Sequence, residues 1–277
     1  MGYHREMYRL VIVVWLTSCN WVFDLEQTTS VGAPGEAPLN PRCPPASSGP
    51  PVFSSVSHDL MARDCYYYAL SEDAELAVAT CVVDSTLRLR EGAIGGELHD
   101  VAIAPTSAGY SMDRPALSPE GDHLVIRQFG SGAQRVSWYA RGPSGWVWES
   151  DIDAASGFST GGAPSAGPDR RVLHATGGGL RELHQVGAAW TERSVTSWST
   201  LGVTQGAQPH LSPDGLRLVF VDGDKVMYAD RLTLASTFGP AVEIDSVGKT
   251  TSVFLPSDCA RIFYVTGGSI FFRWLVE

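Results

Sequence analysis

The chain has 277 residues, 44% of them hydrophobic, so it can bury the core of one large domain or two ordinary ones. Lysine and arginine total 20 against 30 aspartate and glutamate, a formal net charge of −10, which provides no basic surface for nucleic acid. Because 29 glycines and 17 prolines interrupt the sequence and no long segment has a helical apolar period, we expect a turn-rich, all-β protein.

The first 20 residues, MGYHREMYRLVIVVWLTSCN, have the layout of an export signal. Arginines precede an apolar run at 10–16 that is too short to span a bilayer. The next residues complete the stretch LTSC, which resembles the bacterial lipobox and implies that residues 1–18 are a signal peptide and that Cys19 is lipidated. The other interpretation is an ordinary signal peptide with a chance cysteine. Lipidation would anchor the chain to a membrane without spanning it.

Two further features concern the cellular location of the chain and its attachment to the membrane. Asn20 follows the lipobox-like cysteine, and by resemblance to the enterobacterial sorting rule this implies an outer-membrane lipoprotein, facing the periplasm or the cell surface. Residues 19–50 are rich in proline, glycine and serine and have no periodic apolar pattern. We expect them to be a tether and residues 51–277 to form the folded domain.

One turn followed by an apolar strand occurs five times in that domain. The copies are ALSEDAELAVAT (69–80), ALSPEGDHLVIRQF (116–129), AGPDRRVLHAT (166–176), HLSPDGLRLVFV (210–221) and FLPSDCARIFYVT (254–266). The turn positions 72, 119, 168, 213 and 257 are separated by 47, 49, 45 and 44 residues. A period near 45 with several short strands per unit is typical of a β-propeller.

Each repeat contains further strands, which predicts five four-stranded blades. The last repeat ends after its third strand, and the segment GPPVFSSV (49–56) precedes the first repeat. We expect this N-terminal strand to complete the last blade and close the ring, which would remove an open sheet edge.

The turn residues are interpreted as structural rather than as ligands. Proline presets the first central φ angle, aspartate caps the local backbone, and glycine tolerates positive φ. The residues assigned to this role are Pro119, Gly121, Pro168, Asp169, Pro213, Asp214, Gly215 and Asp258.

The Ser-Pro-Asp-Gly turn followed by an apolar strand resembles the WD-like repeat of the TolB-type propellers. The resemblance covers residues 51–277 and implies a propeller lipoprotein of Gram-negative bacteria. TolB-type propellers usually have six blades, so a count of five departs from that family.

Four cysteines other than Cys19 permit two disulfides in an exported chain. Cys65 and Cys81 flank the first repeat turn almost symmetrically, so an antiparallel hairpin would place them opposite each other. Cys43 precedes the closing strand and Cys259 lies in the turn of the blade that this strand completes, which predicts a second bridge. Free thiols or crossed pairing are the alternative.

No catalytic residue, metal site or cofactor is predicted. The histidines have no partner at metal-ligand spacing, and the DGDK stretch (222–225) is interpreted as a hairpin turn. A glycoside hydrolase of this fold needs acids on the inner strands of several blades. In this chain the comparable positions lie two residues before the proline of each inner strand, or its equivalent, and one of the five is an acid. Those positions are Tyr66, Asp113, Gly162, Ala207 and Thr251.

Three tryptophans lie on predicted outer strands, at positions 146, 148 and 190. We expect Trp148 and Trp190 to be equivalent and to pack blade against blade, with sugar stacking as the alternative. The expected function is therefore a lipid-anchored binding or protein-interaction scaffold, whose partner is another envelope protein or a glycan. The alternative is a carbohydrate-binding or glycoside-hydrolase-like five-bladed propeller, and a TolB-like accessory of an envelope complex is a third interpretation.

The lipobox predicts the behaviour of a Cys19→Ala variant. Without the thiol no acyl chain can be attached, so the protein should move from the membrane to the soluble fraction and lose palmitate labelling. Fractionation and metabolic labelling measure both properties. Unchanged partitioning and labelling would show that Cys19 is not the anchor.

Overall fold

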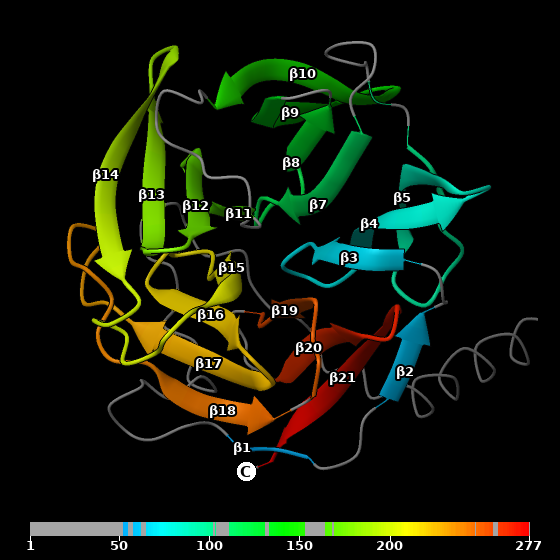
Figure 1. Cartoon of the computed structure of the whole chain (residues 1–277). Coiled ribbons are helices and arrows are strands. Elements are labelled where there is room, and N and C mark those ends of the chain that lie inside the picture. The colour runs from blue at the N-terminus through cyan, green and yellow to red at the C-terminus, as the bar shows by residue number, and fades with distance from the viewer. Residues whose placement is uncertain are drawn as a thin grey trace, which may run out of the picture. The chain divides into compact units, whose positions relative to one another are not determined.

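The computed structural model describes residues 52–54, 58–61, 65–101, 103, 111–130, 133–152, 164–167, 169–246, 248–256 and 260–276. These residues form strands and turns that assemble into five antiparallel sheets arranged as the blades of a ring (Figure 1). The predicted five-bladed propeller is confirmed. Among the described residues no helix is long and apolar enough to cross a membrane.

Four blades use strands that are consecutive in the chain, each ordered from the centre of the ring outward in sequence, as Figure 1 shows. Blades 1 and 2 consist of β3 (Cys65–Leu70), β4 (Leu76–Val83), β5 (Thr86–Ala93), β6 (His99–Asp100), β7 (Ser111–Leu117), β8 (His123–Gly130), β9 (Ala133–Gly142) and β10 (Gly145–Ile152). Blades 3 and 4 consist of β11 (Pro164–Gly167), β12 (Arg171–Thr176), β13 (Gly179–Val186), β14 (Ala189–Ser197), β15 (Ala207–Leu211), β16 (Arg217–Asp222), β17 (Lys225–Asp230) and β18 (Val242–Ser246).

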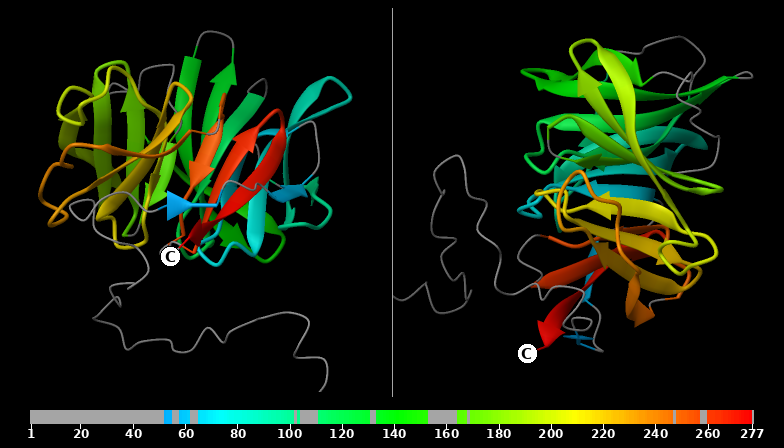
Figure 2. Two further views of the ribbon diagram at one scale, coloured as in Figure 1. Left: turned by 90° about the horizontal axis from the view of Figure 1, so that it is seen from below. Right: turned by 90° about the vertical axis from the view of Figure 1, so that its left-hand side faces the viewer.

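The fifth blade combines both ends of the propeller. Its three C-terminal strands are β19 (Ser252–Phe254), β20 (Arg261–Thr266) and β21 (Ser269–Val276), and β1 (Val52–Phe53) pairs antiparallel with the end of β21. The registered pairs are Val52 with Val276 and Phe53 with Leu275. Figure 2 shows from two further directions that β1 lies beside the C-terminal end of β21. Closure by an N-terminal strand is therefore confirmed.

The closing segment is longer than the sequence indicated. After β1, a second strand, β2 (His58–Met61), pairs with the beginning of β21, placing His58 opposite Phe272 and Met61 opposite Ile270. The predicted strand at 49–56 therefore includes β1 but not β2. Part of that predicted strand (49–51 and 55–56) lies outside the described residues. Residues 58–61, HDLM, lack the strict apolar alternation that marks a strand in sequence.

The apolar core is divided among the interfaces between adjacent blades. Each of the five buried clusters combines side chains of two neighbouring blades, with blade 5 packing on blade 1 to complete the ring. Middle strands such as β12, which is buried at five consecutive positions, turn both faces to neighbours. Phe53 of the closing strand belongs to the cluster between blades 4 and 5. Closure therefore adds core as well as backbone pairing.

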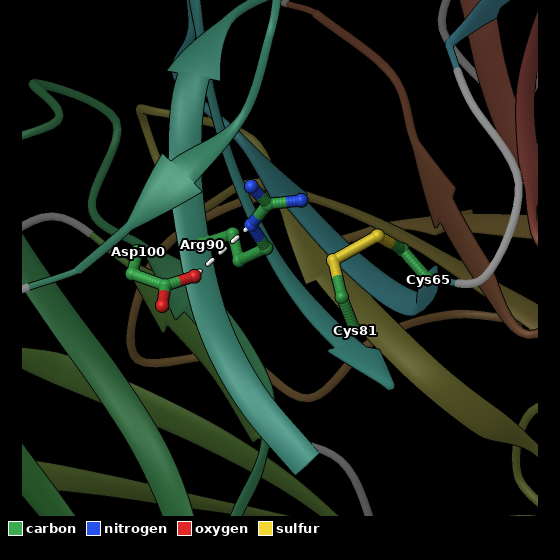
Figure 3. Close-up of a disulfide and its surroundings, with 4 residues drawn as sticks. All are labelled: Cys65, Cys81, Arg90 and Asp100. Carbon is green, nitrogen blue, oxygen red and sulfur yellow. Dashed lines mark ion pairs between the residues drawn. A yellow bond between two sulfur atoms is a disulfide. The ribbon is translucent and has the colours of Figure 1, made fainter. Parts of the chain in front are cut away.

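A disulfide joins Cys65 on β3 to Cys81 on β4, which are opposite each other in the ladder, as predicted. Figure 3 shows this bridge together with an ion pair of the same blade, in which Arg90 Nε lies 3.2 Å from Asp100 Oδ1. Both cysteines are buried in the cluster between blades 5 and 1. The second predicted bridge, Cys43 to Cys259, lies outside the described residues, as does Cys19.

Removal of the closing strands should unfold the ring. Deleting residues 20–61 removes β1 and β2, whose ladder bonds contribute about 0.5–1.5 kcal/mol each and whose Phe53 contributes roughly 1.5–3 kcal/mol by burial. Their sum is comparable to the roughly 5–15 kcal/mol that stabilises a typical domain, so a large fall in Tm is expected. Deleting residues 20–42 is the control and should leave Tm nearly unchanged. Equal melting of the two variants would contradict closure.

Candidate functional site

The innermost strands of all five blades surround a small cavity at the centre of the ring. Its volume is about 40 Å³. A buried water needs roughly 10–15 Å³, so the cavity has room for about three waters. The lining residues include Tyr67, Arg114, Ser165, Gln208, His210 and Ser252.

Two of these residues are placed by backbone bulges. Arg114 (φ 51°) and Gln208 (φ 53°) have left-handed conformations, which are uncommon for residues other than glycine, and each directly precedes a proline. The ladder register shifts between Asp113 and Ala116, and again between Ala207 and His210. Proline cannot donate to the ladder, and a bulge changes the direction of nearby side chains. In both blades, a bulge before a proline thus directs a polar residue, Arg114 or Gln208, to the cavity.

Arg114 belongs to a charged cluster at the edge of the cavity. The buried carboxylate of Asp113 accepts hydrogen bonds from Arg127 Nε at 2.7 Å and from Arg127 Nη2. Arg114 Nε lies 3.9 Å from the same carboxylate, and its guanidinium lies 5.2 Å from the centroid of the Tyr67 ring. Two guanidinium groups therefore face one carboxylate. Of the sixteen described residues that line the cavity, Arg114 alone carries a formal charge at neutral pH.

His210 is a neutral member of the lining. Its ring packs on Phe254 with centroids 4.2 Å apart, and burial lowers the pKa of His210 to about 3. It is therefore uncharged at physiological pH. Its Nε2 atom is shielded from solvent and has no hydrogen-bond partner in the part of the chain that the structure describes. A buried ring nitrogen of this kind is a position where a small bound molecule or a water could bond.

The two serines of the lining connect neighbouring blades. Ser165 Oγ on blade 3 accepts a hydrogen bond from Leu211 N on blade 4 at 3.0 Å. Ser252 Oγ on blade 5 accepts one from Tyr68 N on blade 1 at 3.4 Å. Because these oxygens already accept a backbone N–H, their hydroxyl protons remain able to donate. The lining is thus rich in donors.

The repeat turns lie at the other ends of the innermost strands, away from the bulges. In the fourth blade Leu216 N donates to Asp214 Oδ1 at 2.9 Å, and Gly215 has a φ of 68°. Pro213 lies in the same turn, as Pro119 does in the second blade, where Gly121 has a φ of 72°. In the third blade Asp169 takes a positive φ of 55°. Pro168 and Asp258 lie outside the described residues.

A serine begins three of these turns, and its role was not predicted from the sequence. Ser212 Oγ accepts from Arg217 N at 2.8 Å and donates to Asp214, and Ser71 bonds in the same way to Leu76 N at 2.9 Å. In the second blade Ser118 donates to Asp122 at 2.8 Å, so the acid is two positions later than Glu120. The signal was present in the sequence, because a serine immediately precedes the turn position in three copies.

The predicted equivalence of Trp148 and Trp190 is wrong. Trp190 is the second residue of β14 and corresponds to Trp146, the second residue of β10, rather than to Trp148. Trp146 donates to Glu91 on blade 1 at 3.1 Å, and Trp190 donates to Ser150 on blade 2 at 3.2 Å. These two indoles connect each blade to the preceding one. Trp148 does not pack between blades: it is 44% exposed, and it lies where the register of the β9–β10 pair shifts, between Trp148 and Ser150.

A buried ion pair also connects two blades. Glu182 on β13 of blade 3 accepts two hydrogen bonds from Arg231, which follows β17 of blade 4, at 2.6 and 3.0 Å. Ser194 and Arg171 bond to the same carboxylate at 3.1 and 3.4 Å. Burial alone would raise the pKa of Glu182, but the hydrogen bonds and charge of Arg231 outweigh it and lower the pKa from its ordinary value of 4.5.

The described residues contain no group of three or more His, Cys, Asp or Glu side chains that could hold a metal ion. The stretch 222–225 forms the turn between β16 and β17, with Gly223 at a φ of 67°. The buried acids Asp113 and Glu182 are each engaged by an arginine.

No family model matches the sequence, and no curated protein matches it. The fold is similar to TolB from Acinetobacter baumannii (TM-score 0.50, 12% identity, 78% of this chain covered), and this chain spans 55% of the TolB chain. It is also similar to a structural-genomics target described as a gluconolactonase (0.50, 10%, 84% of this chain and 97% of that one). A gluconolactonase from Xanthomonas campestris has a TM-score of 0.49 at 10% identity, with 82% and 98% covered. At these identities the likeness shows the fold alone.

The buried ion pair predicts a pH-dependent loss of stability. Replacing Arg231 with Met leaves Glu182 buried without its main partner, which should cost about 3–5 kcal/mol of unfolding free energy at pH 7. Because the pKa of Glu182 is lowered in the folded protein, the pair stabilises above the ordinary value of 4.5 and loses this effect as pH falls through the folded pKa. The difference between wild type and variant should therefore shrink on acidification.

Urea denaturation at pH 7 and at low pH measures this difference. The matched control is Arg181→Met. Arg181 lies on the same strand as Glu182, and its replacement removes a partly exposed pair with Glu192 on β14. Such a pair contributes about 0–1 kcal/mol, so the control should change little. Similar losses in the two variants would contradict the importance of the buried pair.

Proposed function

We propose that this chain is a lipid-anchored propeller of the Gram-negative envelope that binds another envelope protein and catalyses no reaction. The anchor is Cys19, behind the apolar run of the signal segment, and the membrane is the outer membrane. Residues 19–50 act as the tether between lipid and propeller, which faces the periplasm or the cell surface.

The observation that carries the preference for binding over catalysis is the state of Asp113. It is the one acid among the five inner-strand positions considered above, and both of its oxygens accept hydrogen bonds from Arg127. Glycoside hydrolysis needs one carboxylic acid that can donate a proton and a second carboxylate at a set distance. An acid whose two oxygens are both held by Arg127 is poorly placed to donate a proton to a substrate or to attack one.

The disulfide supports export. Cys65 and Cys81 are both buried, and their bridge joins β3 and β4, the first two strands of blade 1. Disulfides persist mainly in oxidising compartments such as the bacterial periplasm. This agrees with a signal segment that ends in a lipobox-like stretch.

The proposed docking surface is the face of the ring where the innermost strands begin. Tyr66, the second residue of β3, is 48% exposed there, next to Tyr67 of the cavity lining. Its carbonyl accepts a hydrogen bond from Thr251 Oγ1 at 2.7 Å, which connects blades 1 and 5 at this point. An exposed tyrosine on a rigid backbone is a frequent centre of binding energy in protein interfaces.

Site-specific photo-crosslinking in cells tests this surface. A photoreactive phenylalanine analogue in place of Tyr66 should yield one product of defined mass with an envelope protein. The matched control places the same residue at Leu232, which is 93% exposed after β17, at the opposite ends of the strands. Products of equal yield and mass at both positions, or no product at Tyr66, would contradict the proposed surface.

Trp148 favours glycan binding as a second candidate. Its indole N–H donates to Asp151 at 3.1 Å, and Arg135 Nη1 also donates to Asp151 at 3.0 Å. This arrangement holds an exposed aromatic ring beside polar groups, as sugar binding requires. A glycan array with the full chain and with Trp148→Ala, run beside a hydrolase screen, separates this candidate from protein binding. If the variant still bound the same glycans, Trp148 would be excluded as the sugar-binding residue.

A further inference from the structure

The groups around the central cavity favour an anion. Arg114 supplies a positive charge, and Gln208 has an amide that can donate. The hydroxyl protons of Ser165 and Ser252 are available because their oxygens accept backbone amides from adjacent blades. No carboxylate is among the described lining residues, although the whole chain carries a net charge of −10. The charge of the cavity lining is therefore opposite in sign to the net charge of the chain.

The cavity can be reached from one face of the ring. Tyr67, Arg114 and Gln208 are partly exposed, whereas Ala116, Leu117 and the other deeper lining residues of β7 are buried. The Tyr67 ring lies beneath the guanidinium of Arg114 at 5.2 Å, which restricts where that group can move. The charge is thus held at the accessible end of the cavity.

We propose that the central cavity binds the carboxylate group of a small organic acid, with Arg114 as its counter-charge. This proposal goes beyond the protein partner proposed above: the cavity opens on the same face as the docking surface, but carboxylate binding can be measured without any protein partner.

Shape favours a carboxylate over other anions. The cavity has a volume of about 40 Å³, which is room for about three waters, and the carboxylate group would replace them while the rest of the acid extends toward the accessible face. The planar guanidinium fork matches a planar carboxylate with two parallel hydrogen bonds.

His210 adds a neutral polar group to this site. Its Nε2 atom is buried without a hydrogen-bond partner among the described residues, and His210 is a lining residue together with Arg114 and Gln208. As a neutral imidazole it can donate one hydrogen bond or accept one from a protonated group of the ligand. It can therefore contribute to selection among acids without adding charge.

The experiment is a calorimetric titration of the full chain with propionate, and with propionamide as the neutral isostere. Propionate should bind and propionamide should not, with affinity on the order of millimolar because the ligand is small. Arg114→Gln should weaken propionate binding at least tenfold, since a charge-assisted pair is lost. Arg88→Gln is the matched control, because Arg88 pairs with Asp100 on the exterior of blade 1, and it should bind like wild type.

A second variant covers the case in which Arg114→Gln fails to fold. Gln208→Glu keeps Arg114 and adds a negative charge to the lining, so it should also weaken propionate binding at least tenfold. Thermal melting verifies that each variant is folded. Equal binding of propionate and propionamide, unchanged affinity in folded Arg114→Gln or Gln208→Glu, or stronger binding of sulfate than of propionate would each overturn the proposal.

Discussion

The structure depends on the pairing of the N-terminal strands with the last strand of the chain. Every apolar cluster in the described core lies between two blades, so no blade can bury both of its faces alone. Blade 5 obtains its outer strand from β1 and β2, and Phe53 of β1 fills part of the cluster that it shares with blade 4. Closed pairing also covers the edge of β21, which would otherwise expose a row of backbone groups. The ring is therefore one cooperative unit.

Closure in turn fixes the centre of the ring. The innermost strands contact one another around the circle, including β19 of blade 5 with β3 of blade 1. Hydrogen bonds from Tyr68 to Ser252 and from Leu211 to Ser165 cross two of these boundaries. The buried Glu182–Arg231 pair and the indole of Trp190 connect neighbouring blades nearer the outside. Adjacent blades are joined both near the centre of the ring and nearer its outside. The positions of Arg114 and Gln208 in the cavity therefore depend on the whole ring.

The sequence predicted the features that repeat. The turn and strand recur at a nearly constant period, so blade number, turn residues and the Cys65–Cys81 bridge could be inferred from spacing. It did not reveal β2, because HDLM has no alternating pattern. The equivalence of Trp190 with Trp146 depends on hairpin register, which the sequence left open.

The contacts between blades and the central cavity were harder to predict, because their parts are distant in the sequence. Glu182 and Arg231 are 49 residues apart, and only the packing of blade 3 on blade 4 brings them together. Arg114 and Gln208 face the cavity because of bulges at positive φ before proline, which ordinary strand alternation does not predict. A proline follows each of these two residues in the sequence, but the change in side-chain direction became visible only in the backbone.

Closure of the ring by the N-terminal strand is the claim on which the account of the cavity rests. The most direct measurement places cysteines at Val52 and Val276, which are opposite each other in the β1–β21 ladder. Cα atoms in such a pair are close enough for a disulfide. Non-reducing peptide mapping should find residues 52 and 276 linked within one chain, and should find no link when cysteines replace Val52 and Val186, which is exposed on blade 3. Failure of the 52–276 bridge to form in a folded protein that retains the Cys65–Cys81 bridge would contradict the account.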